Sequence, residues 1–272
     1  MKIENHLVSG DNVALKPSPN KSGKFDRNLP DTIIIHFTAG PSAQSAINTL
    51  TNPAYKVSAH LVIDFDGSIT QLVPFDEIAW HAGVSSWENR TGLNKYSIGI
   101  EIVNPGNLTK AGDEYQAWFG KKYTADKVIK AVHRNENKPR YWHIYTPEQI
   151  DAVLQLCRLL TDTYDIKYIL GHEEIAPLRK LDPGPAFPLN RLRDKILNNR
   201  KDDENDDTIP ETGKVTASKL NIRESPDINS AKIAKPLPKN SRVEILDSKN
   251  GWYKVTAKIT GWVAGKYINT DK

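Results

Sequence analysis

A run of three isoleucines near the N-terminus most constrains the fold. Ile33, Ile34 and Ile35 are consecutive, and turn-forming residues bound them on both sides, at 30–31 and 39–40. A short β-branched run without polar alternation is typical of a strand buried on both faces, as in the centre of a sheet covered by helices. The sequence therefore predicts an α/β domain with a mixed central β-sheet flanked by helices.

A histidine ends this predicted strand. Ligand and catalytic sites of open α/β sheets usually lie at the carboxyl ends of the strands, which makes His36 a candidate functional residue. The alternative is a core histidine satisfied by a backbone carbonyl, because buried polar groups normally have hydrogen-bond partners. His36 alone does not decide between the two.

A second predicted strand, residues 96–104, carries a carboxylate within an apolar run. Three isoleucines share one face of it, and Glu101 lies on the other. Burying an ionised carboxylate without a partner costs several kcal/mol, so Glu101 must be paired, raised in pKa or close to a metal. A structural salt bridge is one explanation. A general base beside a metal-bound water is the other.

Residues 171–185 place a histidine, a lysine and an aspartate in one loop. Lys180 and Asp182 are two apart, and the proline after Asp182 favours an extended chain, so both side chains leave the same face. A turn at residues 176–177 can return His172 toward Asp182. This pair suits zinc if a third ligand is present, and His36 is the candidate.

His60 and Cys157 are two further residues whose chemistry could be functional. His60 lies in a predicted strand that ends in a hairpin turn, and we favour a satisfied sheet histidine over a substrate contact. Cys157 lies in a segment, 150–160, with apolar residues at helical spacing, and we expect it to be a buried small hydrophobe. With one cysteine, no disulfide framework is possible.

These segments together resemble the zinc-dependent N-acetylmuramoyl-L-alanine amidases of the type 2 class, which include muropeptide-recycling and phage lysozyme-type amidases and, more distantly, the peptidoglycan recognition proteins. The resemblance spans roughly residues 5 to 195. It rests on four motifs in the expected order, at residues 35–39, 79–83, 97–101 and 171–187.

The resemblance implies roles for individual residues. A single zinc ion is expected on His36, His172 and Asp182, with Glu101 as general acid/base and Lys180 polarising the scissile carbonyl. The implied reaction is hydrolysis of the amide between N-acetylmuramic acid and the L-alanine of the stem peptide. Trp80 and His81 match the wall of the family's substrate groove, so they join His60 as candidate substrate contacts.

The C-terminal part has a different character. Residues 199–212 are polar and acidic, which predicts a flexible linker between a catalytic domain, 1–198, and a second domain, 213–272. The second domain has short apolar runs separated by turn residues, as in a small all-β barrel, and it resembles a bacterial SH3 domain. The resemblance implies that this domain holds the enzyme on cell-wall polymer. Its 12 basic and 5 acidic side chains would suit an anionic wall, and the alternative is a generic charged surface on a passive domain.

Residues 106–145 form a basic insertion containing tryptophans, which is expected to line the substrate groove or to solvate one face. We expect His133 and His143, which lack ligand spacing, to lie on the surface. A net charge of +4 and the lack of a recognised motif argue against nucleic-acid binding.

Two cellular settings fit the sequence, the cytoplasm and the cell wall. The N-terminus lacks the apolar core of a secretory signal, and no stretch approaches a membrane span, so synthesis in the cytoplasm is expected. A monomer acting on peptidoglycan or muropeptides is expected, either on recycled fragments in the cytoplasm or at the wall after non-classical or phage-type release. The alternatives are a recycling amidase for soluble anhydro-muropeptides and a non-catalytic peptidoglycan-binding protein.

Overall fold

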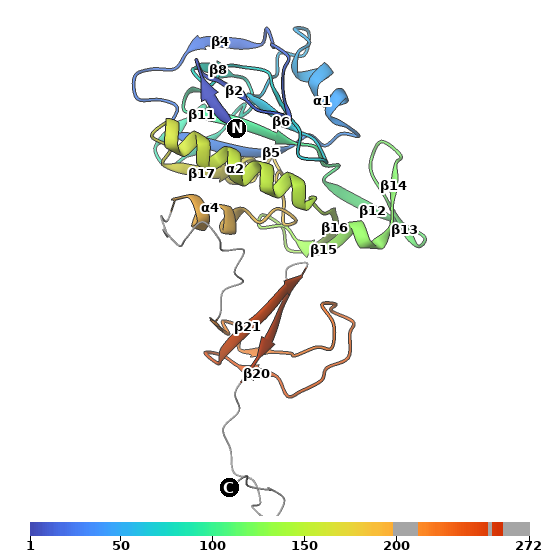
Figure 1. Ribbon diagram of the computed structural model, residues 1–272. Helices are drawn as coiled ribbons and strands as arrows, with labels where there is room; N and C mark the ends of the chain where they lie inside the picture. The colour runs from blue at the N-terminus through green and yellow to red at the C-terminus, as the bar shows by residue number, and fades with distance from the viewer. Residues whose placement is uncertain (198–211, 250–251, 258–272) are drawn as a thin grey trace, which may run out of the picture. The chain divides into compact units, whose positions relative to one another are not determined.

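The computed structural model describes residues 1–197, 212–249 and 252–257 (Figure 1). The chain divides into two compact units, residues 1–200 and 201–272. The predicted linker falls outside the described residues except for Thr212. Within the described residues, no helix combines the length and the apolar character needed to cross a bilayer.

A six-stranded mixed sheet is the centre of the first unit. Its first four strands run parallel, the fifth is antiparallel to the fourth, and the sixth pairs in parallel with the fifth. In spatial order the strands are β17 (Tyr168–Gly171), β5 (Thr32–Phe37), β11 (Ser97–Ile102), β6 (Leu61–Ile63), β7 (Ile69–Gln71) and β3 (Val13–Leu15). The isoleucine run lies in β5, between two parallel neighbours, and the prediction of a mixed α/β sheet is confirmed.

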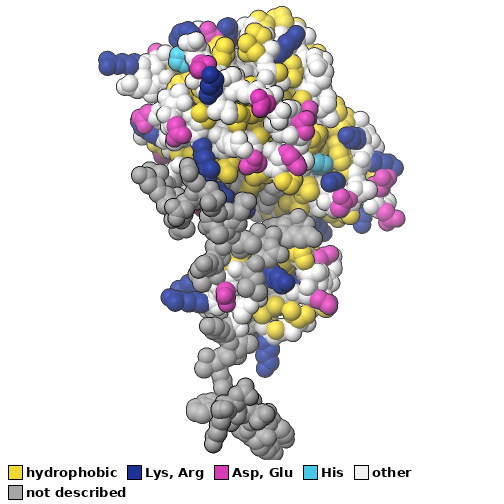
Figure 2. Space-filling view, viewed as in Figure 1, with side chains coloured by type: hydrophobic (Ala, Val, Ile, Leu, Met, Phe, Trp, Pro, Cys, Tyr) yellow, Lys and Arg dark blue, Asp and Glu magenta, His cyan; other side chains and the backbone are white. Residues whose placement is uncertain are grey.

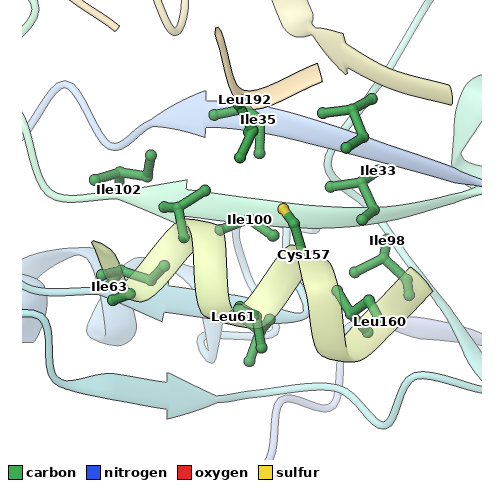
Figure 3. Packing of buried hydrophobic residues seen from close by; sticks show 14 of the residues in the cluster. Ile33, Ile35, Leu61, Ile63, Ile98, Ile100, Ile102, Cys157, Leu160 and Leu192 are labelled. Carbon is green, nitrogen blue, oxygen red and sulfur yellow. The ribbon is translucent and has the colours of Figure 1, made fainter. Parts of the chain in front are cut away.

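Two helices pack on one face of this sheet (Figure 1). They are α2 (Pro147–Thr163) and α4 (Leu189–Leu197). Helix α2 begins with a capping box at Thr146 and a proline in its first turn, both of which favour a helix start. Its buried Cys157 points at the isoleucines of β5 and β11 (Figure 3). Burial raises the pKa of this thiol to about 12, so it acts as a small apolar side chain.

The opposite face of the sheet carries the candidate site. Alternation along the strands sends Ile33 and Ile35 toward α2, so Ile34 and His36 point the other way. Glu101 is the register partner of His36 on the neighbouring strand. The same side of the sheet is covered farther along by α1 (Ala43–Leu50) and next to β17 by the single turn α3 (His172–Ile175).

The insertion between β11 and α2 forms a sheet of its own. This inserted sheet is antiparallel, with the order β14 (Lys122–Tyr123), β13 (Glu114–Gln116), β12 (Asn107–Ala111), β16 (Pro139–His143) and β15 (Val128–Val132). The expectation that His133 and His143 lie on the surface is wrong, because they are only 1% and 6% exposed. The ring of His133 is hydrogen-bonded to Glu173, and that of His143 packs against aromatic rings.

Short elements complete the first unit. They are β1 (Lys2–Glu4), β2 (Leu7–Ser9), β4 (Lys21–Lys24), β8 (Glu77–Ala79), β9 (Ser86–Trp87), β10 (Arg90–Thr91) and the 3₁₀ turns η1 (Leu93–Lys95) and η2 (Ala125–Lys127). On the face seen in Figure 2, acidic and basic side chains of this unit are intermingled and do not form one patch of a single sign.

The described part of the second unit consists of strands, as predicted. Three pair as an antiparallel sheet, β18 (Thr212–Lys214), β21 (Arg242–Lys249) and β22 (Trp252–Thr256), and two more pair with each other, β19 (Lys219–Leu220) and β20 (Leu237–Pro238). The last part of the predicted second domain, residues 258–272, lies outside the described residues.

Candidate active site

Three ligand atoms converge at the carboxyl ends of two adjacent parallel strands. His36 lies near the end of β5, and His172 begins α3 directly after β17. Nδ1 of His36, Nδ1 of His172 and Oδ2 of Asp182 lie 2.9 Å from one another, and the side chains are buried. The structure thus brings together the three residues that the sequence analysis proposed as ligands, in an arrangement that could hold a metal ion.

The outer ring nitrogens fix the tautomers of both histidines. Nε2 of His172 donates to the carbonyl of Ala82 at 3.1 Å. Nε2 of His81 donates to the carbonyl of Ser97 at 3.2 Å, so its Nδ1 is free to accept from Nε2 of His36 at 3.0 Å. Each ligand histidine therefore carries its proton on Nε2 and presents an unprotonated Nδ1 toward Asp182. Such outer hydrogen bonds typically orient metal-binding imidazoles.

The three converging atoms of His36, His172 and Asp182 fit a bound metal ion better than hydrogen bonds among themselves. Burial lowers the pKa of His36 to about 4 and that of His81 well below its ordinary value, so both rings are neutral near pH 7. Two nitrogen lone pairs and a carboxylate oxygen then face one another without a proton between them. A cation at their centre removes this repulsion, and two imidazoles with one carboxylate are typical ligands of a catalytic metal.

Glu101 lies beside this cluster with an unsatisfied oxygen. Its Oε2 is buried and has no hydrogen-bond partner among the residues that the structure describes. Burial raises the pKa of Glu101 to about 8, the negative charge of Asp182 acts in the same direction, and the positive charge of Lys180 acts in the opposite one. A carboxyl group with a pKa near neutrality is suited to both accepting and donating a proton.

Lys180 reaches the same space from the loop between the ligands. It is partly exposed, and its charge lowers the pKa values of both Glu101 and His36. Its neighbour Arg179 holds the loop in place by donating to the carbonyls of Ala82 and Val84 at 3.0 and 2.7 Å. The positive charge of Lys180 thus acts on two residues of the candidate site, and its role as a carbonyl-polarising group stays a prediction.

The three candidate substrate contacts have different surroundings. His60 is fully buried, its Nε2 donates to the Glu77 carbonyl at 2.9 Å, and its Nδ1 accepts from the Gly99 amide at 3.0 Å. Neither ring nitrogen remains for a ligand. His81 is bonded to His36, as described above. Trp80 is partly exposed, and its indole N–H donates to the hydroxyl of Ser22.

Gly99 and Asn94 hold His81 in place, a role that the sequence analysis missed. The side-chain oxygen of Asn94 accepts from the backbone amides of His81 and Ala82, at 3.0 and 2.7 Å. A Cβ atom at Gly99 would lie 2.4 Å from Cγ of the His81 ring. A glycine inside a strand pattern often marks such a close approach, and this was the available signal.

Alanine at Gly99 is expected to weaken metal binding. Its methyl group would displace the His81 ring and break the bond that orients His36, and loss of such an outer partner typically costs about 10- to 100-fold in metal affinity. Competition with a chromophoric chelator would measure this loss. Gly40→Ala is the matched control, since a Cβ there meets only ordinary contacts at 3.6 Å or more. Equal affinity in the two variants would contradict the assigned role.

Comparison with protein families identifies both units. Residues 26–185 match the family described as N-acetylmuramoyl-L-alanine amidase. Residues 218–269 match the bacterial SH3 domain. The amidase match contains all five residues to which the sequence analysis assigned metal-binding or catalytic roles.

Individual relatives agree with the family match. N-acetylmuramoyl-L-alanine amidase AmiD of Escherichia coli (strain K12) is 36% identical over 169 residues, 59% of this chain and 51% of AmiD, so the chain spans about half of that relative. 1,6-anhydro-N-acetylmuramyl-L-alanine amidase AmpD of the same organism is 32% identical over 196 residues, 65% of this chain and 88% of AmpD. The crystal structure of a selenomethionine AmpD derivative matches with a TM-score of 0.53 and 27% identity, over 72% of this chain and 99% of that one. This chain belongs to the N-acetylmuramoyl-L-alanine amidase family, and a bacterial SH3 domain follows its amidase domain.

Proposed function

We propose that the chain is a zinc-dependent hydrolase that cleaves the amide bond between N-acetylmuramic acid and the L-alanine of the stem peptide. The observation that carries the proposal is the convergence of two unprotonated imidazole nitrogens and one carboxylate oxygen beside Glu101, whose Oε2 has no hydrogen-bond partner within the described part of the chain. His36, His172 and Asp182 would hold the zinc ion. When bound, zinc supplies Lewis-acid polarisation and lowers the pKa of water.

The chain's own residues supply the proton transfers and the charge stabilisation. Glu101 takes a proton from the attacking water and then delivers it to the nitrogen of the departing L-alanine, for which a pKa near neutrality is suited. The ammonium group of Lys180 stabilises the negative charge that develops on the carbonyl oxygen. His81 and the Ala82 carbonyl keep the imidazoles of His36 and His172 oriented throughout.

The C-terminal domain is proposed to hold the enzyme on cell-wall polymer. Its 12 basic and 5 acidic side chains give it a net charge of +7, and such a surface is attracted to an anionic wall over long range. Peptidoglycan at the wall is therefore the first substrate that we propose. The second is a soluble anhydro-muropeptide in the cytoplasm. The similarity to AmpD, a 1,6-anhydro-N-acetylmuramyl-L-alanine amidase, favours this substrate.

Digestion of two substrates separates these proposals. The full-length protein, loaded with zinc, is incubated with purified peptidoglycan sacculi and with soluble anhydro-muropeptides, each with and without a chelator, and the products are analysed by mass spectrometry. Stem peptides that begin with L-alanine, lost on chelation and restored by zinc, are the expected result. A faster release from sacculi favours the wall, and a faster release from soluble fragments favours recycling. Binding without cleavage of either substrate would overturn the hydrolase proposal in favour of a recognition protein.

A further inference from the structure

A buried glutamate closes the ligand loop, residues 172–184, which carries the candidate metal ligands His172 and Asp182. Glu173 directly follows His172 and is only 4% exposed. Its backbone N–H donates to the carbonyl of Asp182 at 2.8 Å, and its Oε2 accepts from the backbone N–H of Gly184 at 3.1 Å. One residue thus connects the start of the loop, beside His172, to the segment around Asp182.

The segment after β15 of the inserted sheet supplies two side-chain partners of this glutamate, Arg134 to its Oε1 at 3.3 Å and His133 to its Oε2. His133 follows β15 and is 1% exposed. Its Nδ1 accepts from the backbone N–H of Asn135 at 3.2 Å, so the ring proton lies on Nε2 and is donated to Oε2 of Glu173 at 2.5 Å. The side chain of Asn135 adds a bond to the Glu173 carbonyl at 2.8 Å. Both ring nitrogens of His133 therefore have hydrogen-bond partners, and Nε2 is bonded to Glu173 of the ligand loop.

An aromatic ring fixes the position of His133. Trp142 of β16 stacks on the imidazole, with ring centroids 5.6 Å apart and planes at 26°. Trp142 also lies close to the ligand loop, because a Cβ built at Gly184 would lie 3.0 Å from the Trp142 ring. The inserted sheet therefore packs on the segment after Asp182 and also bonds to the residue after His172.

We propose that His133 and Glu173 are positioning residues of the metal centre, through which the inserted sheet sets the spacing between His172 and Asp182. The inference rests on the proposed function, since it requires that these two residues hold a metal ion. Glu173 touches no ligand atom and acts only through the loop that it closes. Because a metal ion demands its ligand atoms within a few tenths of an ångström, loosening this closure weakens binding even where the fold is retained.

The test measures zinc affinity in the full-length protein. In His133→Phe the ring that stacks on Trp142 is kept and the donor to Glu173 is lost, and we expect zinc affinity about 10- to 100-fold below that of the unmodified chain, by competition with a chromophoric chelator. His133→Gln keeps an N–H donor and should recover most of the loss. His143→Phe is the matched control, because His143 is a buried histidine of the same sheet with no bond to the ligand loop, and its affinity should stay within about twofold.

Two further readouts separate positioning from general destabilisation. The visible spectrum of the cobalt-substituted protein should change in His133→Phe and not in His143→Phe, whatever their melting temperatures. Glu173→Gln, which keeps an acceptor for Gly184 but removes the charge, provides a second variant if His133→Phe does not fold, with weaker zinc binding as the expected result. Unchanged affinity and spectrum in the folded variants would overturn the inference. Failure of the unmodified chain to bind zinc would instead overturn the proposed function.

Discussion

Substitution of His36 by alanine is expected to remove both bound zinc and amidase turnover. Among the described residues, the imidazole is one of three candidate ligands, and the remaining nitrogen and carboxylate oxygen would not complete a catalytic zinc site. Metal polarisation contributes several kcal/mol to the transition state, so turnover should fall by at least about 1,000-fold. Zinc content after gel filtration and release of stem peptides from peptidoglycan measure the two effects.

The control for this variant is another buried histidine of the same unit. His143 has a pKa lowered to about 4 by burial, but it lies outside the ligand cluster. His143→Ala should therefore lose stability while it retains one zinc per chain and most of its activity. Stoichiometric zinc in His36→Ala would contradict the ligand assignment. Zinc loss in both variants would show that unfolding, and not ligand removal, causes the effect.

The central sheet and the convergence of the three candidate ligands could be predicted because their signals are local or follow from topology. Three adjacent isoleucines indicate a strand buried on both faces, and the structure has β5 between two parallel strands. Parallel strands end at the same edge of a sheet, which is why His36 and His172 meet although 136 residues separate them. Glu101 could be singled out as a candidate functional residue because burying a carboxylate in an apolar strand is costly.

The outer hydrogen bonds around the ligands could not be predicted in the same way. The bond between His36 and His81 joins segments 45 residues apart, and it depends on the rotation of two rings that no periodicity records. His133 and His143 lie among charged residues, and that composition indicated a surface. They are buried because pairing in the inserted sheet gives their rings partners, Glu173 for one and Asn104 for the other.

Glu101→Gln is expected to retain zinc and to lose most of its turnover. The amide has nearly the same shape as the protonated carboxyl group, but it cannot accept a proton from water or deliver one to the leaving amine. General acid/base groups contribute about 100- to 10,000-fold, so kcat should fall within that range while zinc content stays at that of the unmodified chain. Normal turnover in this variant would remove Glu101 from the proposed mechanism.

The same substitution is expected to stabilise the metal-free protein, by an amount that grows with pH. Burial raises the pKa of Glu101 from 4.5 to about 8, so the folded chain holds this proton more tightly than the unfolded chain does. The stability conferred by this group is fully present below pH 4.5 and is lost as the pH rises through 8. Glutamine does not titrate, so Glu101→Gln should gain stability relative to the unmodified chain between pH 5 and pH 8, by on the order of 3 kcal/mol. Urea unfolding of both chains in chelator at a series of pH values measures this difference. A difference that is constant with pH would show that the carboxyl group of the metal-free protein is not held in its protonated form, which would leave Glu101 suited only to accepting a proton at neutral pH.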